Sequence, residues 1–136
     1  MVDQPQKFDK KVVVVGGGFA GTTIAERLWN NAHVTLVDKK DHFEYFITNF
    51  RLLIKTNDFD QISVAYEDIR KAHNNVFDFV QGALTTVNTD DTITITKEDG
   101  STQQIPYDIL IISTGFSYND PIKSDHLKAE ERRKHI

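Results

Sequence analysis

The sequence has no cysteine among its 136 residues. Disulfide bonds, cysteine-ligated metals and thiol chemistry are therefore excluded from this chain, and the composition agrees with a reducing compartment. The five histidines lie scattered, without the spacing that metal sites typically show. We therefore expect neither a disulfide framework nor a metal centre.

Long apolar runs are also absent. No stretch reaches the roughly 18 apolar residues that a membrane-spanning helix needs. The first residues, MVDQPQKFDKK, contain no apolar signal core, and Val2 stands where N-myristoylation requires a glycine. The net charge of −4 argues against a nucleic-acid-binding protein. A chain of this length suits one domain with a core of its own.

The stretch VVVVGGGFAG is the most informative feature that is present. Four valines, Val12 to Val15, run directly into three glycines. A run that is apolar at every position suits a strand covered on both faces, as in a parallel sheet. Small and apolar residues then recur at helical spacing from Phe19 to about Asn30, and HVTLVD predicts a second strand that ends at Asp38. The first third therefore reads as strand, glycine turn, helix, strand.

The rest of the chain changes in character. Apolar residues within 39–57 share one stripe, which predicts a second helix, and YEDIRKAH predicts a short helical turn. The stretches VFDFVQ, ALTTVN and TITITK, with a turn at Asp99-Gly100, predict an antiparallel meander between about Val76 and Ile105. YDILIISTG predicts one more buried strand, and the charged tail SDHLKAEERRKHI is helix-prone. We expect His42 on the surface or in a loop.

Gly16, Gly18 and Gly21 match the pattern G-x-G-x-x-G. The first glycine permits a tight turn out of the strand, the second lets a pyrophosphate approach the main chain, and the third allows close packing of helix on sheet. The helix N-terminus then offers unpaired N–H groups and partial positive charge to phosphates. The structural alternative is a glycine-rich turn that merely connects a strand to a helix.

Asp38 lies about 20 residues further on, where a ribose-binding acid is expected. An acid at this place favours an unphosphorylated ribose, as in the adenosine of FAD or NAD. The glycine motif and the acid do not separate these two cofactors. The predicted meander does, because a plain NAD-binding domain continues with alternating strands and helices.

The chain resembles the FAD-binding half of the pyridine-nucleotide flavoprotein oxidoreductases. Within that group it is similar to the apoptosis-inducing-factor-like branch, which includes the ferroptosis suppressor protein and neighbours the type II NADH dehydrogenases. The matching stretches are VVVVGGGFAGTTIAERL, VTLVDKKDHFEYFITNFRLLI, FVQGALTTVN and YDILIISTGFSY. The resemblance implies an α/β, Rossmann-like FAD-binding domain with a central parallel sheet and an inserted antiparallel β-meander. We assign residues 1–10 to a flexible N-terminus, 11–120 to this domain, and 121–136 to the start of a connection to a missing NAD(P)H-binding domain.

The resemblance also implies cofactor contacts residue by residue. Asp38 would bind the adenosine ribose, with Lys40 near the adenosine side. Arg51 would contact the flavin, although a solvated helix residue is the alternative. Val80 would meet the adenine through its backbone. The residues implied for the FAD pyrophosphate are Gly16, Gly17, Gly18, Phe19, Ala20 and Gly21.

A turn near the end of the sequence completes the implied site. Thr114 and Gly115 match the branch's A-T-G turn against the cofactor, with Ser113 in place of the usual alanine. The aromatic residues Tyr45, Phe46 and Phe50 either border the flavin or belong to the core. No residue stands out as an acid, base or nucleophile, so we name no catalytic residue.

The implied activity is that of an NAD(P)H-dependent flavoprotein oxidoreductase with FAD as cofactor and NADH or NADPH as co-substrate. No C-x-x-x-x-C pair follows the first helix, which argues against a disulfide reductase and favours a quinone or similar acceptor. We expect the location to be cytoplasmic, or peripheral on a membrane or mitochondrion. The expected partners are FAD, the remaining domains of the same protein, a quinone-like acceptor and further copies through an exposed docking surface, but no nucleic acid.

A second glycine motif and a later G-D motif, which the family's enzymes use, do not occur in this sequence. We therefore expect an N-terminal fragment, a truncated product or an unusual gene model, which is inactive alone and either binds FAD weakly or is purified without it. Two alternatives stay open. One is a stand-alone NAD-binding domain, and the other is a non-enzymatic nucleotide-binding module that has kept the fold.

Overall fold

The computed structural model describes residues 8–53, 59–116 and 125–134, with the backbone alone for residues 50–53. Its centre is a parallel sheet of four strands in the order β5-β2-β1-β9. These strands are β1 (Lys11–Val15), β2 (His33–Asp38), β5 (Asp78–Gln81) and β9 (Ile109–Ile112). Because all four run parallel and in register, their carboxyl ends meet at one edge, where an open α/β sheet typically binds its ligand.

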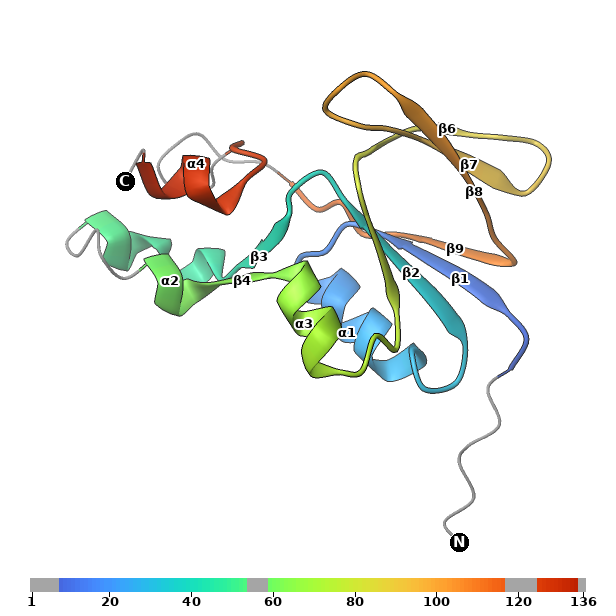
Figure 1. The fold of residues 1–136 in the computed structure, drawn as a ribbon, viewed down its shortest axis with the longest axis horizontal. Helices are drawn as coiled ribbons and strands as arrows, with labels where there is room; N and C mark the ends of the chain where they lie inside the picture. Colours follow the sequence, from blue (N-terminus) through green and yellow to red (C-terminus); the bar gives the residue numbers. More distant parts are fainter. Residues whose placement is uncertain (1–7, 54–58, 117–124, 135–136) are drawn as a thin grey trace, which may run out of the picture.

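The sheet is covered on both faces, which explains why the four valines of β1, Val12 to Val15, form an uninterrupted apolar run. Val12 and Val14 pack with α1 (Phe19–Leu28) and α3 (Tyr66–Ala72), whereas Val13 and Val15 pack under the meander. The meander consists of β6 (Ala83–Val87), β7 (Thr92–Thr96) and β8 (Thr102–Pro106). Figure 1 shows the helices on one side of the sheet and the meander on the other. The predicted parallel sheet and meander are thus confirmed.

The stretch VFDFVQ corrects the predicted extent of the meander. It forms β5, which pairs in parallel with β2 in the main sheet and takes no part in the antiparallel ribbon. Phe79 packs on the helix side and Val80 on the meander side. A strand with apolar contacts on both faces belongs in a covered parallel sheet. The β-rich composition of the stretch could not distinguish the two kinds of pairing.

The region after β2 also differs from the predicted helix. It begins with β3 (His42–Glu44), which pairs antiparallel with β4 (Ser63–Ala65), and continues as the 3-10 helix η1 (Phe46–Leu53). The short helix α2 (Phe59–Ile62) precedes β4, and the tail forms α4 (Ala129–Lys134). The predicted turn at YEDIRKAH is α3. In Figure 1, α4 lies beside β3 and η1, at the carboxyl edge of the sheet.

The packing of the meander on the sheet predicts a clear difference between two truncations on it. Ile95 is fully buried against the sheet, whereas Val87 is half exposed. We expect Ile95→Ala to lower the free energy of unfolding by about 2–5 kcal/mol, because it leaves a cavity between the layers. Val87→Ala should cost about 1 kcal/mol or less. Urea unfolding of both variants would measure this, and equal losses would contradict the layer arrangement.

Candidate functional site

The glycine turn is held between its neighbouring strands at the carboxyl edge of the sheet. The N–H of Gly16 donates to Val37 O at 2.7 Å, and the N–H of Ser113 donates to Val15 O at the same distance. Gly16 has a φ of +100°, a conformation that side-chain-bearing residues rarely adopt. The turn is therefore part of the sheet's own hydrogen-bonding scheme and leads directly into α1.

Three of the four glycines are required by the protein itself. A Cβ on Gly16 would overlap the backbone of Ser113, and a Cβ on Gly21 would overlap the carbonyl oxygen of Gly16. A Cβ on Gly17 would overlap the hydroxyl of Tyr66. Close packing of the helix start on the strand end thus explains these positions without any ligand.

Gly18 is the exception. It precedes α1 with φ −70° and ψ −166°, a conformation open to any residue, and a Cβ here would meet no atom within 4 Å. Neither backbone strain nor internal packing accounts for a glycine at this place. Gly18 is among the residues that line the cleft at the start of α1, where helix N–H groups favour anions.

The cleft beside the turn has a volume of about 330 Å³ and is lined by the glycine turn, the segment after β2 and the segment after β9. A second hollow of about 360 Å³ shares Gly16, Asp38 and Lys39 with it. That hollow shares Gly82 and Ala83 with a third, larger one of about 990 Å³ between β5 and the meander. The three adjoin one another along the carboxyl edge and suit an elongated ligand.

Asp38 connects the end of β2 to the glycine turn. One carboxylate oxygen accepts the N–H of Gly17 at 2.5 Å, and the other accepts the N–H of Lys40 at 2.8 Å. The carboxylate lines the cleft and, with two lone-pair sites on each oxygen, can still accept a ribose hydroxyl. The structure thus gives Asp38 a shaping role that the sequence did not reveal.

Tyr66 is a site residue that no sequence pattern indicates. Its buried hydroxyl donates to Gly17 O at 2.7 Å from the first residue of α3. Burial raises the pKa of this phenol well above its usual range, and the nearby charge of Asp38 raises it further, so the hydroxyl remains a donor. No local pattern could have indicated a contact between residues 49 positions apart.

The segment after β9 forms the opposite wall of the cleft. Thr114 and Gly115 line it, and Gly115 has a φ of +66°. The hydroxyl of Ser113 donates to the carbonyl oxygens of Val15 and Gly16, at 3.1 and 3.0 Å. The serine in place of the usual alanine therefore strengthens the connection between β9 and the glycine turn.

The remaining predicted contacts are distributed along the groove that the cleft and the two hollows form together. Phe19 and Ala20 line the cleft at the start of α1, and the ring of Phe19 packs edge-on against those of Phe43, Tyr45 and Phe46. Val80 lines the large hollow from β5, the edge strand of the described sheet. Lys40 lines the cleft, with its side chain 12% exposed. The side chains of Arg51 and Phe50 lie outside the described residues.

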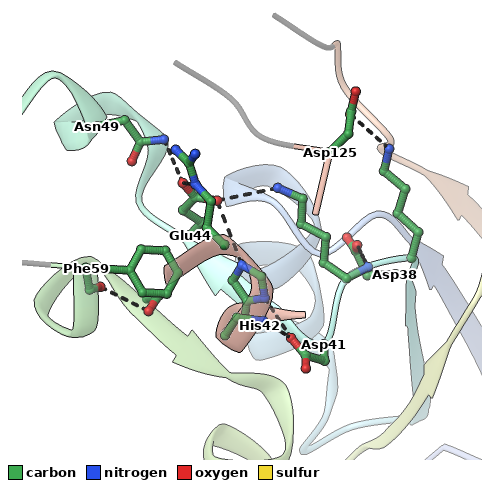
Figure 2. A network of polar contacts seen from close by, with 12 residues as sticks. Asp38, Asp41, His42, Glu44, Asn49, Phe59 and Asp125 are labelled. Carbon is green, nitrogen blue, oxygen red and sulfur yellow. Dashed lines mark hydrogen bonds and ion pairs between the residues drawn. The ribbon is translucent and has the colours of Figure 1, made fainter. Parts of the chain in front are cut away.

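A buried polar network lies beyond Lys40 on the same wall. Glu44, at the end of β3, accepts a hydrogen bond from Asn49 Nδ2 at 2.7 Å. Its carboxylate also lies 3.4 Å from Lys40 Nζ and 3.4 Å from Arg132 Nε. Figure 2 shows Glu44 between Asn49 and His42. The segment after β2, η1 and α4 thus converge on one carboxylate.

His42 corrects another expectation, since it is 1% exposed. Its Nδ1 lies 2.7 Å from Asp41 Oδ1, and its Nε2 lies 3.8 Å from Glu44, beyond hydrogen-bonding distance. The preceding residues are polar, which is typical of a loop. The strand pairing of β3 with β4 instead turns the imidazole inward, where it packs near Phe59.

Burial alone would raise the pKa of Glu44, but its neighbours outweigh this effect. Interaction with His42, the charges of Lys40 and Arg132, and the hydrogen bond from Asn49 lower the pKa from 4.5 to about 2. Glu44 is therefore ionised at neutral pH despite being 9% exposed.

Two observations concern other kinds of site. Within the described ranges, no group of three or more histidine, aspartate or glutamate side chains could hold a metal ion. Among the helices that the structure describes, none is long and apolar enough to cross a membrane.

The comparisons with known proteins agree with this geometry. The model of the family described as pyridine nucleotide-disulphide oxidoreductase matches residues 10–135. The chain belongs to this family. The match confirms the family predicted from the sequence, and with it FAD as the family's cofactor and a nicotinamide nucleotide as co-substrate.

Individual relatives are more distant. The chain is 28% identical over 116 residues to apoptosis-inducing factor homolog B of Dictyostelium discoideum, covering 85% of this chain and 27% of that protein. It is 29% identical over 122 residues to ferroptosis suppressor protein 1 of Xenopus laevis, covering 85% and 30%. A solved structure of NDH2 from Plasmodium falciparum superimposes with a TM-score of 0.73 at 21% identity, covering 83% and 24%. The chain thus spans about a quarter to a third of the proteins that it matches.

The lowered pKa of Glu44 predicts how its contribution to stability depends on pH. The ionised carboxylate stabilises the folded state above about pH 4.5, by on the order of 3 kcal/mol, and this contribution is lost as the pH falls through about 2. We expect the stability gap between the unmodified chain and Glu44→Gln to be constant from neutral pH to about 4.5 and to close towards pH 2. Chemical unfolding at several pH values would measure it. A gap that did not change with pH would contradict the assigned pKa.

Proposed function

We propose that this chain is the FAD-binding part of an NAD(P)H-dependent flavoprotein oxidoreductase. The observation that carries the proposal is Gly18, the one glycine of the turn that neither backbone conformation nor packing requires. A bare main chain at the start of a helix, open to a cleft, fits a diphosphate. Membership of the family supports the proposal that this diphosphate is that of FAD.

The described residues fit this cofactor along the groove. The N–H groups at the start of α1 would face the diphosphate, and Asp38 would accept from the adenosine ribose. The large hollow beside Val80 has room for the adenine. Lys40 also lines the cleft and supplies positive charge there. These residues bind and orient the cofactor, while FAD itself supplies the hydride and electron chemistry when bound.

We further propose that the whole protein reduces a quinone or a similar small acceptor. The absence of cysteine supports this, since a disulfide acceptor built into these residues would need a cysteine pair. The chain's short span relative to its relatives supports further domains that bind the nicotinamide nucleotide. Ile109, Ile112 and Phe116 are about half exposed on and after β9 and offer apolar surface for those domains or for a second copy.

The role of Gly18 is testable by placing a methyl group on its open side. Gly18→Ala should lower the free energy of unfolding of the cofactor-free chain by no more than about 1 kcal/mol, because the added Cβ meets no protein atom and only the N-cap preference for glycine over alanine is lost. Its dissociation constant for FAD should rise about tenfold or more, equivalent to about 1.4 kcal/mol. Flavin fluorescence quenching would measure this, with Thr23→Ala on the exposed side of α1 as the control.

Three results would contradict the proposal. Unchanged FAD affinity in Gly18→Ala would show that the open side of the turn does not meet the diphosphate. Binding of NADH without binding of FAD would favour a stand-alone NAD-binding domain. Binding of neither would favour a non-enzymatic module.

A further inference from the structure

The C-terminal segment, residues 125–134, is hydrogen-bonded to the segment after β2, and each of the two segments donates to the other. The N–H of Asp41 donates to Leu127 O at 2.9 Å, and the N–H of Ala129 donates to Asp41 Oδ1 at 3.0 Å. Asp125 lies 3.5 Å from Lys39 Nζ, a contact drawn in Figure 2. α4 therefore begins at the segment that also carries Lys40.

Arg132 is the residue of α4 that enters the interior. It is 2% exposed, although it stands among charged neighbours in a short surface helix. Its Nε lies 3.4 Å from Glu44 Oε1, the same oxygen that accepts from Asn49. An arginine so deeply buried needs a compensating charge, which Glu44 provides. The side chains of Arg133 and Lys134, by contrast, form ion pairs at the surface.

The second oxygen of Glu44 contacts Lys40, a residue of the cofactor cleft. Oε2 lies 3.4 Å from Lys40 Nζ, and both side chains line the cleft. A lysine side chain loses about 2 kcal/mol of conformational freedom when it is fixed, so its ammonium occupies one place only if a partner holds it. An ammonium has three donors, so binding Glu44 leaves donors for an anion in the cleft.

We propose that Glu44 is a positioning residue for the cofactor: backed by Arg132 of α4 and Asn49 of η1, it fixes the ammonium of Lys40 at the cleft, so that α4 is part of the FAD site. This inference rests on the proposed function. It gives the buried network a role in binding an anionic dinucleotide, in addition to its role in stability. It also assigns to the C-terminal segment a task that its charged, helix-prone sequence does not reveal.

A double-mutant cycle tests whether Glu44 acts through Lys40. We expect Lys40→Met and Glu44→Gln each to weaken FAD binding by the 136-residue chain about tenfold. The double variant should bind no more weakly than Lys40→Met alone, because Glu44 has no further effect once the ammonium is gone. Arg132→Met should weaken binding severalfold, and this effect should likewise vanish in the Lys40→Met background.

A loss of structure alone would give a different pattern. If Glu44 had only a structural role, Glu44→Gln would weaken FAD binding by the same factor in the Lys40→Met background as in the unmodified chain. Additive losses would therefore overturn the inference. The salt dependence of the FAD dissociation constant gives a second readout. This salt dependence should become weaker to the same degree in Lys40→Met and Glu44→Gln. Circular dichroism at the titration temperature verifies folding of each variant. Lys134→Met, which removes a charge from α4 away from Glu44, is the matched control and should bind normally.

The outcomes separate this inference from the proposed function. If the unmodified chain binds FAD and Glu44→Gln binds it equally well, the positioning role is wrong and the proposed function stands. If the unmodified chain does not bind FAD up to millimolar concentration, both are overturned.

Discussion

The close approach of the first helix to the end of the first strand is the constraint on which the rest of this structure depends. Gly21 faces the carbonyl of Gly16 so closely that no side chain fits between them. This contact brings the N-terminus of α1 to the carboxyl edge of the sheet. The same edge receives Asp38 from β2 and the segment after β9, so the helix start, the carboxylate and the opposite wall surround one cleft.

At this turn the structure distinguishes three glycines that packing within the protein requires from one that it does not. Gly16, Gly17 and Gly21 are explained by Ser113, Tyr66 and the turn itself. Gly18 has ordinary dihedral angles and open space, so neither strain nor packing requires a glycine there; beyond its place as the N-cap of α1, a bound group accounts for it. A bound diphosphate thus explains a glycine that neither strain nor packing requires, which is more specific support than the motif as a whole.

The predictable part of this protein is the part where neighbours in sequence are neighbours in space. The valine run, the glycine turn, the first helix and Asp38 follow one another along the chain, so their spacing was sufficient to place them. Tyr66 and Arg132 could not be found in this way, because their partners Gly17 and Glu44 are 49 and 88 positions away. Composition places β5 with the meander because it does not reveal which strand β5 pairs with, and the burial of His42 depends on the pairing of β3 with β4.

The most direct test of the account is where FAD contacts the backbone. Amide NMR spectra of the isotopically labelled chain, recorded during titration with FAD, report each N–H separately. The account predicts that the largest shifts occur at Gly17, Gly18, Phe19 and Ala20, and that ADP, which shares the diphosphate, shifts the same amides. Shifts confined to other residues, with the amides of the glycine turn unchanged, would contradict it.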